Sequence, residues 1–181
     1  MHGRGAPQSK PNKKKAAIHK MLKLFLSLAV CLALVRSKTV QVTWLDCSDS
    51  SYHGKVANVT ITPNPPVLGQ PMHVVATGVM DESIDTGAKY AISMKALAIK
   101  LLDHTDTVCG DTSVKMPAGI GTLTVHGVTC PAPAGDMQFA MDMTLPSTIP
   151  AFGESANIHM TGTDQTGGKL MCVDVSAKIV G

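Results

Sequence analysis

The stretch GKVANVTITPNPPVLGQPMHVVATGV, residues 54–79, decides how this chain folds. Two runs rich in β-branched residues, Gly54–Thr62 and Met72–Val79, flank a segment that contains four prolines. Proline interrupts helices and is excluded from central strands, because it lacks the N–H that a sheet ladder uses. The stretch therefore predicts two strands joined by a loop.

The same succession of strand and turn continues through the rest of the chain. Segments such as DESIDTG and DQTGG carry turn-forming residues and separate apolar runs at spacings of roughly ten residues. The predicted strands are Val40–Asp46, Gly54–Thr62, Met72–Val79, Tyr90–Asp103, Thr122–Thr129, Met137–Leu145, Ala156–Thr163 and Lys169–Val180. This pattern predicts an all-β fold, an immunoglobulin-like antiparallel two-sheet sandwich.

The period of two along a strand assigns side chains to faces. Residues 58–60 form an N-glycosylation sequon, so we expect Asn58 to be exposed as a candidate glycosylation site. Residues two positions apart share a face of the strand, so Val56 is expected to face outward with Asn58, whereas Ala57 and Val59 are expected to face inward.

The alternation of inward apolar and outward polar side chains breaks within the run Tyr90–Asp103. Lys95 faces outward in the first half, yet Leu97 and Ile99 are apolar at positions that share its parity. A bulge or bend near Ala96 would turn both halves toward one core. We therefore expect Leu97 and Ile99 to face inward.

The N-terminal segment has the pattern of a signal peptide. Leu24–Val35 is an apolar run of about a dozen residues behind a basic flank, which suits a signal-peptide core better than a membrane span or a buried helix. Small residues near its end predict cleavage after Ser37, and Met21 is a candidate start. The prediction is a signal peptide over 1–37, a single domain over 38–181, and secretion or delivery to the lumen of an endosome, lysosome or vacuole.

Removal of this leader reverses the sign of the net charge. The whole chain carries +3, but residues 38–181 contain eight lysines, no arginine and thirteen acidic residues, which gives −5. Nucleic-acid-binding proteins need a basic surface for the phosphates. The charge therefore excludes a nucleic-acid partner.

Four cysteines remain after the leader: Cys47, Cys109, Cys130 and Cys172. An even number in a secreted chain predicts disulfides, and no C-x-x-C spacing indicates a metal or redox site. Four cysteines allow three pairings, and the residues alone do not choose among them. A nested pairing would join the two ends of the domain and close an internal loop.

Several motifs in a fixed order resemble the ML lipid-recognition family. They are DCS, Y-x-G-K-V, V-x-I-T-P-N-P-P-V-x-G-Q-P, LLDHTDTVC, TCPAPAGD and LMCVDVSAKIV, and together they cover about Asp46–Val180. That family includes secreted Niemann-Pick type C sterol carriers, mite group-two allergens and plant phosphatidylglycerol/phosphatidylinositol transfer proteins.

The resemblance implies a pairing and a function. It implies one disulfide between Cys47 and Cys172 and another between Cys109 and Cys130. It implies a sterol, phospholipid or fatty acid bound between splayed sheets, without catalysis or a cofactor. A monomer that meets a donor or acceptor membrane, or a membrane receptor, is expected.

The chain departs from its relatives between the two middle cysteines. Relatives usually hold these cysteines a few residues apart, whereas here GDTSVKMPAGIGTLTVHGVT intervenes. We expect this insertion to lengthen a hairpin over the cavity entrance.

The alternation and the resemblance together predict which side chains line the cavity. The candidates are Val59, Met72, Val74, Tyr90, Ile92, Met94, Leu97, Ile99, Phe139, Met141, Ile158 and Met160. Nine methionines after the leader suit ligands of irregular shape, because the unbranched side chain adapts easily. The alternative is an interaction module with a solid core that recognises protein or glycan through its loops.

The sequence contains no clear catalytic or metal-binding motif. It has no H-x-H or H-E-x-x-H pair, no D-x-D-x-D-G calcium loop and no G-x-S-x-G elbow. We therefore assign no catalytic residue and no metal ligand, and a metal-dependent enzyme on a sandwich is a remote third hypothesis.

The leader interpretation predicts how the protein is processed. Protein collected from the secretory route should begin at or near Lys38, because signal peptidase reads the small residues that end the apolar run. N-terminal sequencing of secreted material measures this directly. An intact N-terminus on cytosolic protein would contradict both the leader and the disulfides.

Overall fold

The computed structural model describes residues 38–97, 99–116, 119–149 and 154–180. The predicted signal peptide, 1–37, lies outside the described residues. Within the described ranges, no helix is long and apolar enough to cross a bilayer.

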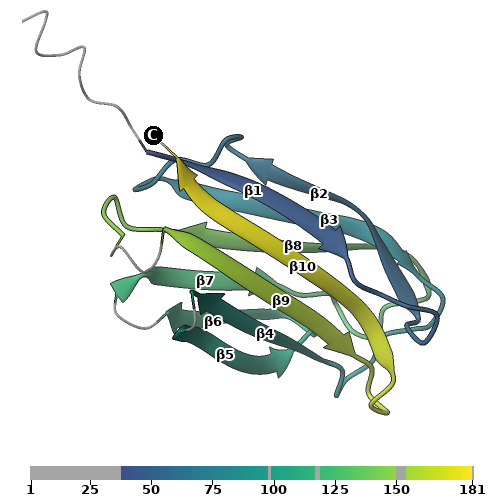
Figure 1. Cartoon of the computed structure of the whole chain (residues 1–181). Helices are drawn as coiled ribbons and strands as arrows, with labels where there is room; N and C mark the ends of the chain where they lie inside the picture. Colours follow the sequence, from purple (N-terminus) through teal and green to yellow (C-terminus); the bar gives the residue numbers. More distant parts are fainter. Residues whose placement is uncertain (1–37, 98, 117–118, 150–153, 181) are drawn as a thin grey trace, which may run out of the picture. The chain divides into compact units, whose positions relative to one another are not determined.

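Ten strands form two antiparallel sheets of five strands each, which confirms the predicted fold class (Figure 1). The first sheet has the order β1-β10-β9-β4-β5, and its strands are β1 (Thr39–Asp46), β10 (Lys169–Val180), β9 (Ser155–Thr163), β4 (Lys89–Ala96) and β5 (Ile99–Thr107). The second sheet has the order β2-β3-β8-β7-β6, and its strands are β2 (Gly54–Thr62), β3 (Pro71–Met80), β8 (Gly135–Thr144), β7 (Gly121–His126) and β6 (Asp111–Met116).

The strand register gives the sandwich two distinct ends. At one end, which we call the hairpin end, β4 turns into β5 and β6 turns into β7. At the other, the disulfide end, Cys47 bonds to Cys172 and Cys109 bonds to Cys130. In Figure 1 the hairpin end lies at the left of the sandwich.

Both disulfides have the pairing that the resemblance implied. Their Cα atoms lie 4.9 Å apart for Cys47–Cys172 and 5.5 Å apart for Cys109–Cys130. The first closes a loop of 125 residues and the second one of 21. On the loop-entropy model these links stabilise the fold by about 5 and about 3 kcal/mol.

The predicted strand Tyr90–Asp103 is in fact a hairpin. β4 ends at Ala96, Ala96 pairs with Ile99, and Leu97 adopts a left-handed conformation with φ of 54°. The expectation that Leu97 and Ile99 face inward is wrong, because their side chains are 76% and 50% exposed. The chain turns back at Leu97, and the β4–β5 register also shifts between Met94 and Lys95.

A bulge in β2 changes the predicted faces of two residues. The register between β2 and β3 shifts between Val56 and Asn58, so Ala57 is the extra residue. Val56 packs against the core and Ala57 is exposed, which reverses the prediction for both. Gly78 pairs with Val56, and a Cβ there would collide with the carbonyl oxygen of Lys55.

The mid-chain insertion forms an additional strand. It supplies β6, which was not predicted, and β6 pairs with β7 from Asp111–His126 to Met116–Gly121. The predicted hairpin is therefore present, and it widens the second sheet by one edge strand.

Four side chains form a ladder of ion pairs on the outer face of the second sheet. His73 Nδ1 lies 2.7 Å from Asp142 Oδ1, and His126 Nε2 lies 2.8 Å from Asp142 Oδ2. His126 Nδ1 lies 3.1 Å from Asp111 Oδ2. The ladder therefore crosses β3, β8, β7 and β6 in turn.

The ladder shifts the pKa of two of its members. Hydrogen bonds to Asp142 and Asp111 raise the pKa of His126, because both ring nitrogens donate only in the imidazolium form. Hydrogen bonds from His126 and His73 lower the pKa of Asp142.

These shifts predict a pH-dependent stability. The raised folded-state pKa of His126 means that its contribution is complete below its unfolded pKa, about 6.5, and is lost as pH rises through the folded value. Asp142 contributes above its unfolded pKa, about 3.9, and this is lost as pH falls through the lowered value. His126→Gln should therefore lower the melting temperature more at about pH 5 than at about pH 8.5.

The control for this experiment is Thr122→Ala on the same strand, because Thr122 is exposed and pairs with Thr144, outside the ladder. Thermal melts of the three proteins across pH measure the difference. A His126→Gln deficit that does not change with pH would mean that the ladder acts through packing and not through charge.

Candidate functional site: the cavity between the sheets

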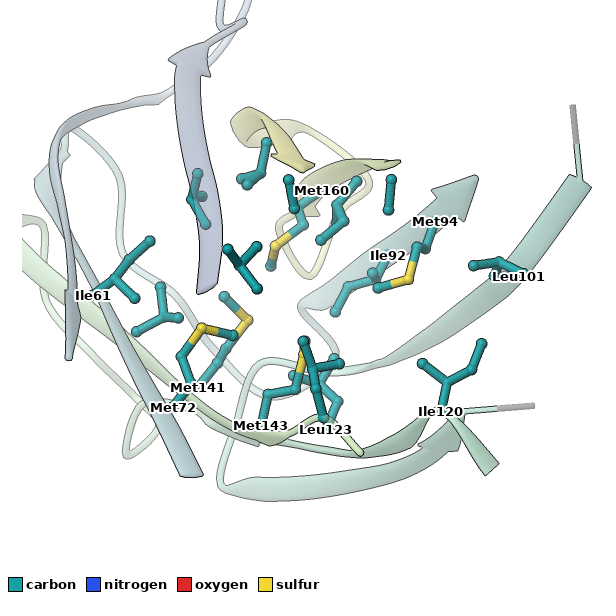
Figure 2. Close-up of a pocket in the computed structure, with 18 of the residues that line it drawn as sticks. Ile61, Met72, Ile92, Met94, Leu101, Ile120, Leu123, Met141, Met143 and Met160 are labelled. Atoms are coloured by element: carbon teal, nitrogen blue, oxygen red, sulfur yellow. The ribbon is translucent and has the colours of Figure 1, made fainter. Parts of the chain in front are cut away.

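The interior between the sheets is not completely filled. A cavity of about 120 Å³ lies toward the hairpin end, and every side chain around it is aliphatic or methionine. These side chains are Val40, Val42, Val59, Ile61, Met72, Val74, Ile92, Met94, Leu101, Ile120, Leu123, Met141, Met143, Leu145, Ile149, Ala156, Ile158, Met160, Val175, Ala177 and Ile179. Figure 2 shows Ile92 of one sheet across the space from Met143 and Leu123 of the other.

A second hollow of about 60 Å³ continues the interior toward the disulfide end. The two hollows share five lining residues: Val59, Val74, Met141, Met160 and Val175. Along β10 the lining runs from Ile179 to Leu170, which at about 3.3 Å per residue spans about 30 Å. The two hollows therefore belong to one elongated apolar interior.

The structure places ten of the twelve predicted residues at these hollows. Val59, Met72, Val74, Ile92, Met94, Met141, Ile158 and Met160 line the first, and Tyr90 and Phe139 line the second. Leu97 and Ile99 line neither, since they lie exposed at the β4–β5 turn. Leu101, two residues further along β5, takes the inward position instead.

The sequence interpretation missed the walls that β1, β7 and β10 supply. Val175, Ala177 and Ile179 alternate along β10, and this period could have placed them inside. Ile120 and Leu123 come from the insertion, for which the sequence pattern predicted one strand instead of two.

Tyr90 places a polar group at the second hollow, whose lining also includes Thr161. The hydroxyl of Tyr90 lies 2.5 Å from Thr112 Oγ1. Burial raises the pKa of the Tyr90 phenol, so the side chain is neutral at physiological pH. The Tyr90 hydroxyl can form a hydrogen bond with a ligand in this mostly apolar interior.

Two groups of potential metal ligands occur in the described residues, and neither borders the hollows. Cys47, Cys172 and His159 lie together, but both sulfurs are held in the disulfide. His53, Glu82 and Asp164 lie together at the disulfide end.

Asp164 in the second group is engaged within its own turn. Its Oδ1 accepts hydrogen bonds from Thr166 N, Thr166 Oγ1 and Gly168 N. These bonds, that from Thr166 first, lower the pKa of Asp164. The carboxylate therefore has a structural role in ordering the β9–β10 turn.

A two-sheet sandwich with an elongated apolar interior defines a class of proteins that enclose apolar ligands. The family model described as the ML domain matches residues 41–179. The chain therefore belongs to the ML-domain family.

Two curated relatives carry names of transfer proteins. A putative phosphatidylglycerol/phosphatidylinositol transfer protein of Dictyostelium discoideum is 29% identical over 158 residues, 87% of this chain and 100% of its own length. A phosphatidylglycerol/phosphatidylinositol transfer protein of Mycosarcoma maydis is 28% identical over 133 residues, 74% of this chain and 63% of its own length.

Two solved structures share the fold at low identity. A Niemann-Pick type C2 protein from the Japanese carpenter ant has a TM-score of 0.50 at 15% identity, with 74% of this chain and 96% of that chain covered. Chicken MD-1 complexed with lipid IVa has a TM-score of 0.52 at 16% identity, with 80% of this chain and 94% of that chain covered. Both likenesses concern the fold alone.

Proposed function

We propose that this chain binds a lipid between its two sheets and carries it, without chemistry, between membranes. The observation that supports this most directly is the uniformly aliphatic and methionine lining of the first hollow. The names of the curated relatives supply the ligand class, a phospholipid. Sterols and fatty acids present the same apolar surface and are included in the proposal.

The hollows must widen to take up such a ligand. An apolar cavity of about 150 Å³ holds a molecule the size of benzene. The two hollows, of about 120 and 60 Å³, are therefore too small for a whole lipid as they stand. The methionines of the lining can change rotamer at low cost, and they give the interior its capacity to adapt.

The topology indicates which end opens. The chain passes between the sheets four times among the described strands, and three of these passages, β1–β2, β3–β4 and β5–β6, lie at the disulfide end. Isolated bridges between Tyr52 and Lys169 and between Cys109 and Val128 reinforce that end. At the hairpin end the sheets are joined by the β8–β9 passage and by the isolated bridge between Thr39 and Val67. Because this end has fewer links, we propose that lipid enters there.

The apolar interior is sufficient for affinity. Transfer of about 400 to 500 Å² of apolar lipid surface from water contributes on the order of 10 to 12 kcal/mol before the cost of association is subtracted. The Tyr90 hydroxyl would add orientation to this binding rather than most of its energy.

We also propose that this carrier works as a monomer in the secretory route, outside the cell or in the lumen of an endosome, lysosome or vacuole. Four cysteines in two disulfides support an oxidising compartment. Asn58 is exposed on β2, where a glycan would not obstruct the cavity, and we propose it as a glycosylation site.

Native mass spectrometry tests the carrier function most directly. Protein purified gently from its own secretory route should carry a non-covalent mass that organic extraction removes and that matches a lipid. A lipid-free protein that also takes up no added sterol, phospholipid or fatty acid would instead support an interaction module with a closed core.

Filling the cavity should separate binding from stability. Val74 lines both hollows and Met94 lines the first. Val74→Phe or Met94→Trp should reduce uptake of a fluorescent sterol or fatty acid about tenfold or more, because the new ring occupies space that the ligand needs. The melting temperature of the lipid-free protein should be kept or raised, because filling an existing hollow restores lost contacts.

Thr77→Phe is the matched control, because Thr77 is exposed on the same strand as Val74. It should leave uptake unchanged in the same titration. If both cavity variants unfold at lower temperature, as overpacked cores do by roughly 1 to 3 kcal/mol, the hollows are not available to a ligand.

A further inference from the structure

The tip of the β4–β5 hairpin carries two exposed apolar side chains. Leu97 is 76% exposed and Ile99 is 50% exposed, and they lie within three residues of each other. The same hairpin continues directly into the cavity wall, because Met94 and Leu101 line the first hollow. The exposed apolar tip and the cavity lining are therefore parts of one hairpin.

Lysines surround this tip. Lys95 and Lys100 flank it on β4 and β5, and they are paired in register. Lys115 lies one residue from the end of β6, at the same end of the sandwich. Lys100 also contacts Asp103, which leaves Lys95 and Lys115 as the lysines near the tip without a described ion pair.

The charges of the domain are separated between its two ends. Five of its eight lysines lie toward the hairpin end: Lys38, Lys95, Lys100, Lys115 and Lys178. Ten of its thirteen acidic residues lie toward the disulfide end: Asp46, Asp49, Asp81, Glu82, Asp85, Asp106, Asp111, Asp136, Asp164 and Asp174. An anionic surface therefore attracts the hairpin end and repels the disulfide end.

We propose that the hairpin end docks on an anionic phospholipid bilayer, with Leu97 and Ile99 inserted at the boundary between headgroups and acyl chains. The inference rests on the lipid-carrier function proposed above and names the surface that this carrier presents to membranes. Exposed apolar side chains gain free energy by entering that boundary, and lysines beside them bind anionic headgroups. Docking in this orientation places the less constrained end of the sandwich against the bilayer.

Exposure of an apolar residue alone would not carry this inference, because single exposed apolar residues are common. Leu45 and Val79 are also 64% and 54% exposed, at the disulfide end. They differ in their surroundings, since Leu45 pairs with Asp174, and Val79 pairs with Asp136 on one side and Lys55 on the other, so neither has only lysines beside it. An anionic bilayer repels these acidic neighbours, so the two pairs of residues form a matched comparison.

The test measures binding to vesicles of phosphatidylcholine with and without phosphatidylglycerol. The tip variant is Leu97→Asn with Ile99→Gln, because asparagine tolerates the left-handed conformation at position 97. Its affinity for the anionic vesicles should fall at least about tenfold, since burial of even one large aliphatic side chain is worth about the 1.4 kcal/mol that a tenfold change requires. The control, Leu45→Gln with Val79→Gln, should bind as wild type does.

Charge reversal supplies a second, independent variant. Lys95→Glu with Lys115→Glu should weaken binding to anionic vesicles and leave the weak binding to pure phosphatidylcholine unchanged. Melting temperatures of all variants establish that each is folded. Equal loss in the tip and control variants, or no loss in the tip and charge variants, would overturn the docking surface, and so would binding that requires a membrane protein in the vesicle.

Two further measurements separate this inference from the carrier function. The tip variant should take up a fluorescent fatty acid from aqueous monomers as wild type does, yet transfer lipid between vesicles at least about tenfold more slowly, in line with its lost affinity. If no variant takes up lipid but vesicle binding still depends on the tip, the docking surface stands and the carrier function fails. If uptake is normal and transfer is insensitive to the tip, the carrier stands and the docking surface is wrong.

Discussion

The unequal attachment of the two sheets determines the rest of this structure. Among the described strands, three of the four chain passages between the sheets and the Cys109–Cys130 bond lie at one end. At the other end the chain passes between the sheets once among the described strands, and the bridge between Thr39 and Val67 also joins them. The larger of the two hollows lies toward this end, which has fewer links between the sheets. The proposed entry of lipid therefore lies where the two sheets are least connected.

Much of the fold follows from the sequence because the strands alternate regularly and the turns carry proline and glycine. Two of the places where prediction failed are local events that interrupt the alternation of side chains. The extra residue at Ala57 turns Val56 inward, and the tight turn at Leu97 converts one long strand into two. Neither event has a strong signature, since Leu97 is not a typical left-handed residue.

The candidate site was predictable to the extent that alternation was intact. Met72, Val74, Ile92 and Met94 lie on strand segments without an irregularity before them, and they line the hollows as their parity indicates. Within the insertion, Leu123 lies in the predicted strand Thr122–Thr129 but was not assigned to the cavity, and β6 was not predicted at all. The size of the hollows is a property of packing between distant strands, which no local pattern reports.

The β6–β7 hairpin gives the fold a means of variation. β6 pairs only with β7 among the described strands, and it stands at the outer margin of its sheet. The segment leading into β7 nevertheless contributes Ile120 to the cavity wall, and β7 contributes Leu123. Changes in the length or composition of this margin can therefore alter the ligand range of the protein while the bonded end stays intact. The margin of the second sheet is therefore a place where part of the cavity wall can vary without touching either disulfide.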